Sequence, residues 1–106
     1  MTTTLVPEEL LHSVVAYFKP RRVILFGSAA TGAAGADSDH DLLVVLDDDA
    51  PPEHLNWRAS YEARRDWHRA VDIVQCRESA LRARAKVVGS LAYTIVTEGV
   101  IVYERD

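Results

Sequence analysis

Several features that would point to other protein classes are absent from this chain. It has one cysteine, Cys76, so no internal disulfide can form. Its first residues lack the basic stretch and apolar core of a secretion signal, and no apolar run approaches the roughly 18 residues of a membrane span. Basic residues are outnumbered, 12 against 16 acidic ones, which disfavours extended binding to DNA. We therefore expect a cytoplasmic protein that makes no membrane contact.

The composition is that of one folded domain. The chain has 106 residues, of which 48% are hydrophobic, enough for a single core. We expect one domain spanning residues 1–106. Its net charge of -4 is unevenly spread, because aspartates gather between residues 37 and 49 while arginines dominate the later half. A local concentration of carboxylates of this kind indicates cation binding.

Hydrophobic spacing alternates between helical and strand-like patterns, which is typical of an α/β fold. Short continuous apolar runs predict strands that are covered on both faces. The aromatic side chains Trp57 and Trp67 are at helical spacing and are expected in the core, although either could stack on a base. The predicted order is a helix at 7–19, strands at 23–26 and 39–46, a helix at 53–70, a strand at 71–75, a helix at 78–98 bent near 89–90, and a strand at 100–103.

Three aspartates interrupt or begin the apolar strands. Asp39 and Asp41 are two residues apart on a strand, so their side chains share one face at a spacing of roughly 7 Å. Two carboxylates at a buried edge repel each other, and Mg²⁺ relieves that repulsion by taking carboxylate oxygens as ligands. Asp72 lies within another apolar strand and needs a metal or a basic partner. If the two strands are neighbours, the three carboxylates converge.

A glycine and a serine follow the strand at 23–26. Backbone N–H groups at Gly27 and the hydroxyl of Ser28 are suited to bind phosphate. A P-loop is excluded because Ala33 and Ala34 occupy the positions where it needs Lys and Ser or Thr. Two metal ions about 4 Å apart next to a bound phosphate could hold the attacking and leaving oxygens of an in-line displacement, with Asp72 accepting the hydroxyl proton. Nucleotidyl transfer is such a reaction.

The spacing of these motifs resembles the minimal nucleotidyltransferases of the DNA polymerase beta superfamily. The shared pattern is Gly27-Ser28, ten intervening residues, Asp39-His40-Asp41, and Asp72 on a later strand. The resemblance implies a nucleotidyltransferase fold, with a mixed four-stranded sheet and flanking helices. It also implies two Mg²⁺ ions, both bound by Asp39 and Asp41 and the catalytic one also by Asp72, with Gly27 and Ser28 holding the triphosphate of ATP.

The same resemblance implies a partner protein. Minimal nucleotidyltransferases are commonly encoded beside a small helical HEPN-type protein, and some of these pairs act as toxin and antitoxin. This chain is thus similar to an antitoxin that transfers AMP to a tyrosine of its partner. It departs from the family at Ala29, Ala30 and Thr31, where arginines are frequent. A weak or inactive enzyme that acts by binding its partner is therefore the alternative, whereas a DNA-repair polymerase would need DNA-binding domains.

Overall fold

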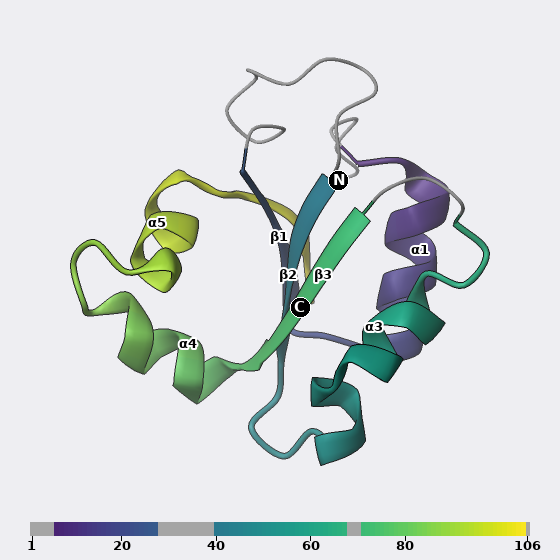
Figure 1. Cartoon of the computed structure of the whole chain (residues 1–106), viewed down its shortest axis with the longest axis horizontal. Coiled ribbons are helices and arrows are strands. Elements are labelled where there is room, and N and C mark those ends of the chain that lie inside the picture. The colour runs from purple at the N-terminus through teal and green to yellow at the C-terminus, as the bar shows by residue number, and fades with distance from the viewer. Residues whose placement is uncertain (1–5, 28–39, 68–70, 106) are drawn as a thin grey trace.

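A mixed four-stranded sheet forms the centre of the molecule (Figure 1). The computed structural model describes residues 6–27, 40–67 and 71–105. Over these residues the strand order is β3-β2-β1-β4. The pairs β1–β2 and β1–β4 are antiparallel, whereas β2 and β3 are parallel. The strands are β1 (Arg22–Phe26), β2 (His40–Leu46), β3 (Val71–Arg77) and β4 (Val100–Glu104).

Helices cover both faces of this sheet (Figure 1). On one face lie α1 (Glu8–Phe18) and α3 (Trp57–Ala63), and on the other lie α4 (Glu78–Ala85) and α5 (Leu91–Glu98). The predicted α/β class is confirmed, and the ends of α1 and of the strands agree with the predicted ones to within two residues, apart from the predicted strand start at Asp39, which lies outside the described residues. None of the described helices is long and apolar enough to cross a membrane.

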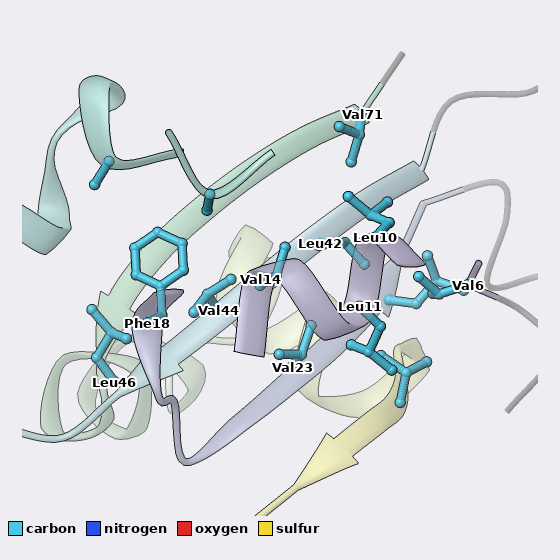
Figure 2. Close-up of a cluster of buried hydrophobic side chains, with 14 residues drawn as sticks. Val6, Leu10, Leu11, Val14, Phe18, Val23, Leu42, Val44, Leu46 and Val71 are labelled. Carbon is cyan, nitrogen blue, oxygen red and sulfur yellow. The ribbon is translucent and has the colours of Figure 1, made fainter. Parts of the chain in front are cut away.

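The strand β2 is apolar on both sides because it separates two hydrophobic clusters. Leu42, Val44 and Leu46 face the larger cluster, which α1 and α3 cover (Figure 2). Leu43 and Val45 face the smaller cluster, which contains side chains from α4 and α5. All five side chains are at most 3% exposed. The prediction of strands covered on both faces is thus confirmed here, and Asp41 begins the face that α4 and α5 cover.

The helix predicted at 53–70 is present but shorter and interrupted. A short 3₁₀ helix covers Pro52–Leu55, and α3 then begins at Trp57 and ends at Ala63. The break occurs at Asn56, whose side chain accepts a hydrogen bond from the backbone N–H of Ala59 and so starts a new helix. Trp57, at the first position of α3, is 73% exposed, so its predicted place in the core is wrong. Trp67 packs against the larger cluster, as predicted.

The predicted helix at 78–98 is two helices. The bend expected near residues 89–90 is a complete break, because Gly89 adopts a φ of +88°. Ser90 then caps α5 by accepting a hydrogen bond from the backbone N–H of Tyr93. The resulting hairpin of α4 and α5 lies across one face of the sheet (Figure 1). At its end Gly99 caps α5 through a hydrogen bond to Ile95, as predicted.

A buried carboxylate connects the start of α4 to the start of β1. Glu78 is 7% exposed, and its oxygens lie 2.5 Å from Arg22 Nη2 and 3.1 Å from Arg82 Nε. The substitution Glu78→Gln is expected to lower the free energy of unfolding by about 2–3 kcal/mol, because it leaves Arg22 without its counter-charge in a half-buried position. Urea unfolding would measure the change.

The exposed pair of Glu62 and Arg65 provides the matched control for Glu78→Gln. Its side chains are 40% and 68% exposed, so Glu62→Gln is expected to cost less than about 0.5 kcal/mol. Equal losses in the two variants would show that the buried carboxylate stabilises the fold no more than a surface pair does.

Candidate active site

Asp41 and Asp72 are neighbours at one edge of the sheet. They are directly paired in the register of the parallel strands β2 and β3. Paired residues on adjacent strands project to the same face, and neighbouring strands are about 4.8 Å apart. Asp41 is half-buried and Asp72 is exposed. The sequence left open whether these two strands are neighbours; the structure pairs them, and this brings the two carboxylates together.

The parallel arrangement explains why these aspartates meet. Each is the second residue of its strand, and parallel strands begin at the same edge of a sheet (Figure 1). The antiparallel strand β1 ends at this edge, where Phe26 pairs with Asp41. Gly27 follows Phe26 directly, so the candidate phosphate-binding residue and both carboxylates occupy one end of three adjacent strands.

Asp41 packs directly against Gly27. A side chain at position 27 would overlap Oδ2 of Asp41, and its Cβ would lie 3.3 Å from Cγ of the same carboxylate. Gly27 also has a φ of +78°, in the left-handed region that favours glycine. Both the left-handed φ and the lack of room for a Cβ favour glycine at this position. The absence of a side chain lets the backbone of Gly27 lie next to the carboxylate of Asp41.

Part of the predicted site lies outside the described residues. Asp39 and Ser28 fall there, as do Ala29, Ala30 and Thr31. Within the described ranges no group of three or more His, Cys, Asp or Glu side chains is placed to hold a metal ion.

The two carboxylates that the structure does describe fit a hard cation. They are adjacent, they share one face, and no described basic side chain forms an ion pair with Asp72. Mg²⁺ binds through one or two carboxylates and completes its shell with water and substrate phosphates. The donor set of Asp41 and Asp72 therefore suits that ion.

Comparison with known proteins identifies the family. Residues 8–106 match the family described as "Polymerase beta, Nucleotidyltransferase". The chain belongs to this nucleotidyltransferase family. No curated protein matches it significantly.

Solved structures share the fold of this nucleotidyltransferase-family chain. One is described as "Crystal structure of the toxin-antitoxin with AMP-PNP". It has a TM-score of 0.59 and 21% sequence identity, over 95% of this chain and 76% of that one. Another is a putative nucleotidyltransferase from Sulfolobus solfataricus, with a TM-score of 0.59 and 23% identity, over 92% of this chain and 76% of the other. At these identities the likeness concerns the fold.

Sequence reasoning missed a hollow beside Gly27 in this nucleotidyltransferase-family domain. A cavity of about 330 Å³ adjoins that residue, and part of its wall comes from α5. The sequence contains no motif that links α5 with Gly27, which lies more than sixty positions earlier. The two are brought together by the packing of α5 on the sheet. The cavity is lined by Phe26, Gly27, Leu91, Thr94, Ile95, Glu98 and Gly99.

The single cysteine of this family member, Cys76, is partly buried. Cys76 follows Asp72 by four residues on β3 and so lies on the same face of the strand, where it packs against the smaller hydrophobic cluster. Burial raises the pKa of its thiol from 9.0 to about 11. Since the thiolate is the reactive form, Cys76 is a packing residue here.

Proposed function

We propose that this chain is a metal-dependent enzyme that transfers a nucleoside monophosphate, AMP from ATP, to a hydroxyl group and releases pyrophosphate. The observation that carries the proposal is the meeting of Asp41, Asp72 and Gly27 at one sheet edge in a member of the nucleotidyltransferase family. Each of these residues alone is common at protein surfaces. Their convergence is what the chemistry of phosphate transfer requires.

The residues have distinct roles in this proposal. Asp39 and Asp41 would hold two Mg²⁺ ions, and Asp72 would help to hold the catalytic one. When bound, Mg²⁺ would neutralise phosphate charge and polarise the reacting oxygens. Gly27 and Ser28 bind the triphosphate through backbone N–H groups and the serine hydroxyl. Because Asp41 packs against Gly27, phosphate bound at Gly27 lies beside the carboxylates.

The reaction balances as an in-line displacement at the α-phosphorus. The acceptor oxygen forms a bond to that phosphorus while the bond to the bridging oxygen of pyrophosphate breaks. The hydroxyl proton passes to the carboxylate of Asp72, and pyrophosphate leaves with the electron pair of the broken bond. Asp72 suits this role because it is exposed at the edge where an acceptor can approach.

The acceptor that we propose is a tyrosine of a small HEPN-type partner protein, so that the chain acts as the antitoxin of a toxin–antitoxin pair. One structure with the same fold is a toxin–antitoxin crystallised with the ATP analogue AMP-PNP, which supports a toxin as the partner and an adenine nucleotide as the donor. Because Asp72 is exposed, an acceptor as large as a protein can bring its hydroxyl group to the carboxylate. The reaction would take place in the cytoplasm, where ATP and Mg²⁺ are available.

The experiment that tests this function is mass spectrometry of the protein encoded beside this gene, after incubation with the chain, ATP and Mg²⁺. We expect a mass increase equal to one or more AMP groups. The double variant Asp39→Ala/Asp41→Ala is expected to give no increase, because it removes the ligands of both metal ions. An equal increase with the double variant would show that these aspartates are not catalytic.

The alternative is a protein that keeps the fold and acts only by binding its partner. The specific observation in its favour is the sequence Ala29-Ala30-Thr31, which lacks the positive charge that helps to hold phosphates. In that case the wild type forms a complex without modifying the partner, and Asp39→Ala neutralises the partner as well as wild type does. The mass measurement thus separates the two functions.

A further inference from the structure

The cavity of about 330 Å³ beside Gly27 opens on the face of the sheet that carries the carboxylates. Ile95, which lines it, belongs with Leu43 to the smaller hydrophobic cluster, and Phe26 packs against that cluster. Leu43 follows Asp41 by two residues on β2, so Asp41 projects to the same face. Because Asp41 packs directly against Gly27, the cavity begins where the candidate metal and phosphate sites meet.

The cavity lies on the β1 side of Asp41, away from Asp72. The strand order β3-β2-β1 places Asp72 on one side of β2 and Phe26 on the other. In the proposed function Asp72 meets the acceptor hydroxyl, so the acceptor approaches from the β3 side. The β1 side, where the cavity adjoins Gly27, is then left for the part of the donor nucleotide that continues beyond its phosphates.

The described lining of this cavity suits a nucleoside better than a phosphate. It includes no basic side chain, and its one charged side chain is the carboxylate of Glu98. A negative charge at this position repels phosphate oxygens. The apolar side chains of Phe26, Leu91 and Ile95 provide a surface for the flat face of a base. A mostly apolar pocket with a few polar groups is typical of sites that bind small molecules.

The two polar side chains of this lining are Thr94 and Glu98. They are four residues apart on α5 and therefore share one side of the helix, and both are exposed. Within the part of the chain that the structure describes, no hydrogen bond or ion pair engages the carboxylate of Glu98 or the hydroxyl of Thr94. Both groups are thus available to a ligand.

The carboxylate of Glu98 stands where it does not help the helix. Glu98 is the last residue of α5, and the last turn of that helix contains no basic residue. The C-terminal end of a helix carries a partial negative charge, which favours basic side chains there and disfavours acidic ones. A ligand that donates hydrogen bonds would supply the partners that the fold does not.

We infer that this cavity binds the nucleoside of the donor nucleotide, and that Glu98 accepts hydrogen bonds from the 2′ and 3′ hydroxyls of its ribose. The inference rests on the proposed function for the nucleotide itself, whose phosphates bind at Gly27. The ribose is one ester bond from the α-phosphate, so it lies near that residue. The two oxygens of a carboxylate match two adjacent hydroxyl donors, and an acidic residue binds ribose hydroxyls in dinucleotide sites. Glu98 therefore selects ribonucleotides.

The test is the binding of nucleotides with Mg²⁺ in the absence of an acceptor. Isothermal titration compares ATP with 2′,3′-dideoxy-ATP, which lacks both ribose hydroxyls. We expect wild type to bind ATP at least tenfold more tightly, because hydrogen bonds to a charged acceptor are strong. In Glu98→Ala the two affinities should lie within twofold of each other. Thermal unfolding should show this variant to be at least as stable as wild type, since alanine favours the helix and the unfavourable charge is removed.

The matched control is Glu62→Ala. Glu62 is also an exposed glutamate in the last turn of a helix, but its helix, α3, covers the other face of the sheet. This variant should keep the wild-type preference for ATP. The inference is overturned if wild type binds the two nucleotides equally, if Glu98→Ala keeps the preference, or if Glu62→Ala loses it.

A further variant tests which part of the nucleotide occupies the cavity. Thr94→Trp places a large side chain in the cavity, and because Thr94 is exposed the core is not disturbed. We expect at least tenfold weaker binding of ATP and less than a twofold change for inorganic triphosphate, which has no nucleoside. Equal weakening of both ligands would overturn the inference, because the cavity would then hold phosphate.

These measurements separate the nucleoside site from catalysis. If the preference for ATP depends on Glu98 but wild type transfers no AMP to the protein encoded beside this gene, the nucleoside site stands and the proposed enzymatic function fails. If wild type transfers the nucleotide equally well from ATP and from 2′,3′-dideoxy-ATP at low concentration, the function stands and Glu98 does not select the donor. If wild type binds neither nucleotide with Mg²⁺, both are overturned.

Discussion

The substitution Asp72→Asn is expected to lower the rate of AMP transfer by a factor on the order of 100 to 10,000, with the fold unchanged. The amide keeps the shape of the carboxylate but can neither accept the hydroxyl proton nor supply a charged oxygen to Mg²⁺. Because Asp72 is exposed and its strand pairing depends on the backbone, the substitution disturbs no packing. Transfer of radioactive AMP to the acceptor would measure the rate.

A second readout distinguishes loss of metal binding from loss of structure. Without metal, Asp72→Asn should be at least as stable as wild type, since it removes the repulsion between two paired carboxylates. Addition of Mg²⁺ should raise the melting temperature of wild type more than that of the variant. A variant that transfers AMP at the wild-type rate would remove Asp72 from the mechanism.

Asp49→Asn is the control for the loss of one negative charge. Asp49 is exposed in the turn that follows β2, at the opposite end of that strand from Asp41. Its substitution should leave both the transfer rate and the response to Mg²⁺ unchanged. If Asp49→Asn lowered the transfer rate as much as Asp72→Asn does, the loss would come from the change in net charge and not from the position of Asp72.

The substitution Gly27→Ala is expected to weaken binding of ATP with Mg²⁺ by at least tenfold and to lower stability. The left-handed φ of +78° costs about 1–2 kcal/mol for a residue with a Cβ. The added methyl group would also overlap Oδ2 of Asp41, so either the carboxylate or the backbone must move. In the proposed function, the carboxylate of Asp41 would bind metal and the backbone of Gly27 would bind phosphate. Isothermal titration and thermal unfolding would measure the two effects.

Gly89→Ala separates backbone strain from the collision with Asp41. Gly89 has a similar φ of +88°, but nothing lies within 4 Å of the position that its Cβ would occupy. We expect a comparable loss of stability, about 1–2 kcal/mol, and no change in ATP binding. If both alanine variants bind ATP equally well, the contact between Gly27 and Asp41 has no role in the site.

Much of the fold could be predicted because its signals are local. The apolar runs of β1 and β2 identify strands covered on both faces, and the spacing of α1 identifies an amphipathic helix. The failures also have local causes that hydrophobic spacing does not register. The side chains of Asn56 and Ser90 cap new helices, so two predicted helices are broken, and Trp57 is left on the surface.

The candidate site was predicted in the same partial way. The identities of Asp41, Asp72 and Gly27 came from the sequence, because carboxylates inside apolar strands need a metal or a basic partner and a Gly-Ser pair after a strand can bind phosphate. Their meeting depended on whether β2 and β3 were neighbours, which the sequence left open. The roles of Asp39 and Ser28 stay predictions, since both lie outside the described residues.

The sequence by itself determined the chemistry that this protein can offer, since residue types and their spacing fix which groups can bind metal and phosphate. Only the tertiary structure decided where those groups meet and what surrounds them. Pairing of β2 with β3 joins Asp41 to Asp72, and packing of α5 on the sheet forms the cavity beside Gly27. Contacts between residues distant along the chain depend on packing of whole elements, which local sequence patterns do not encode.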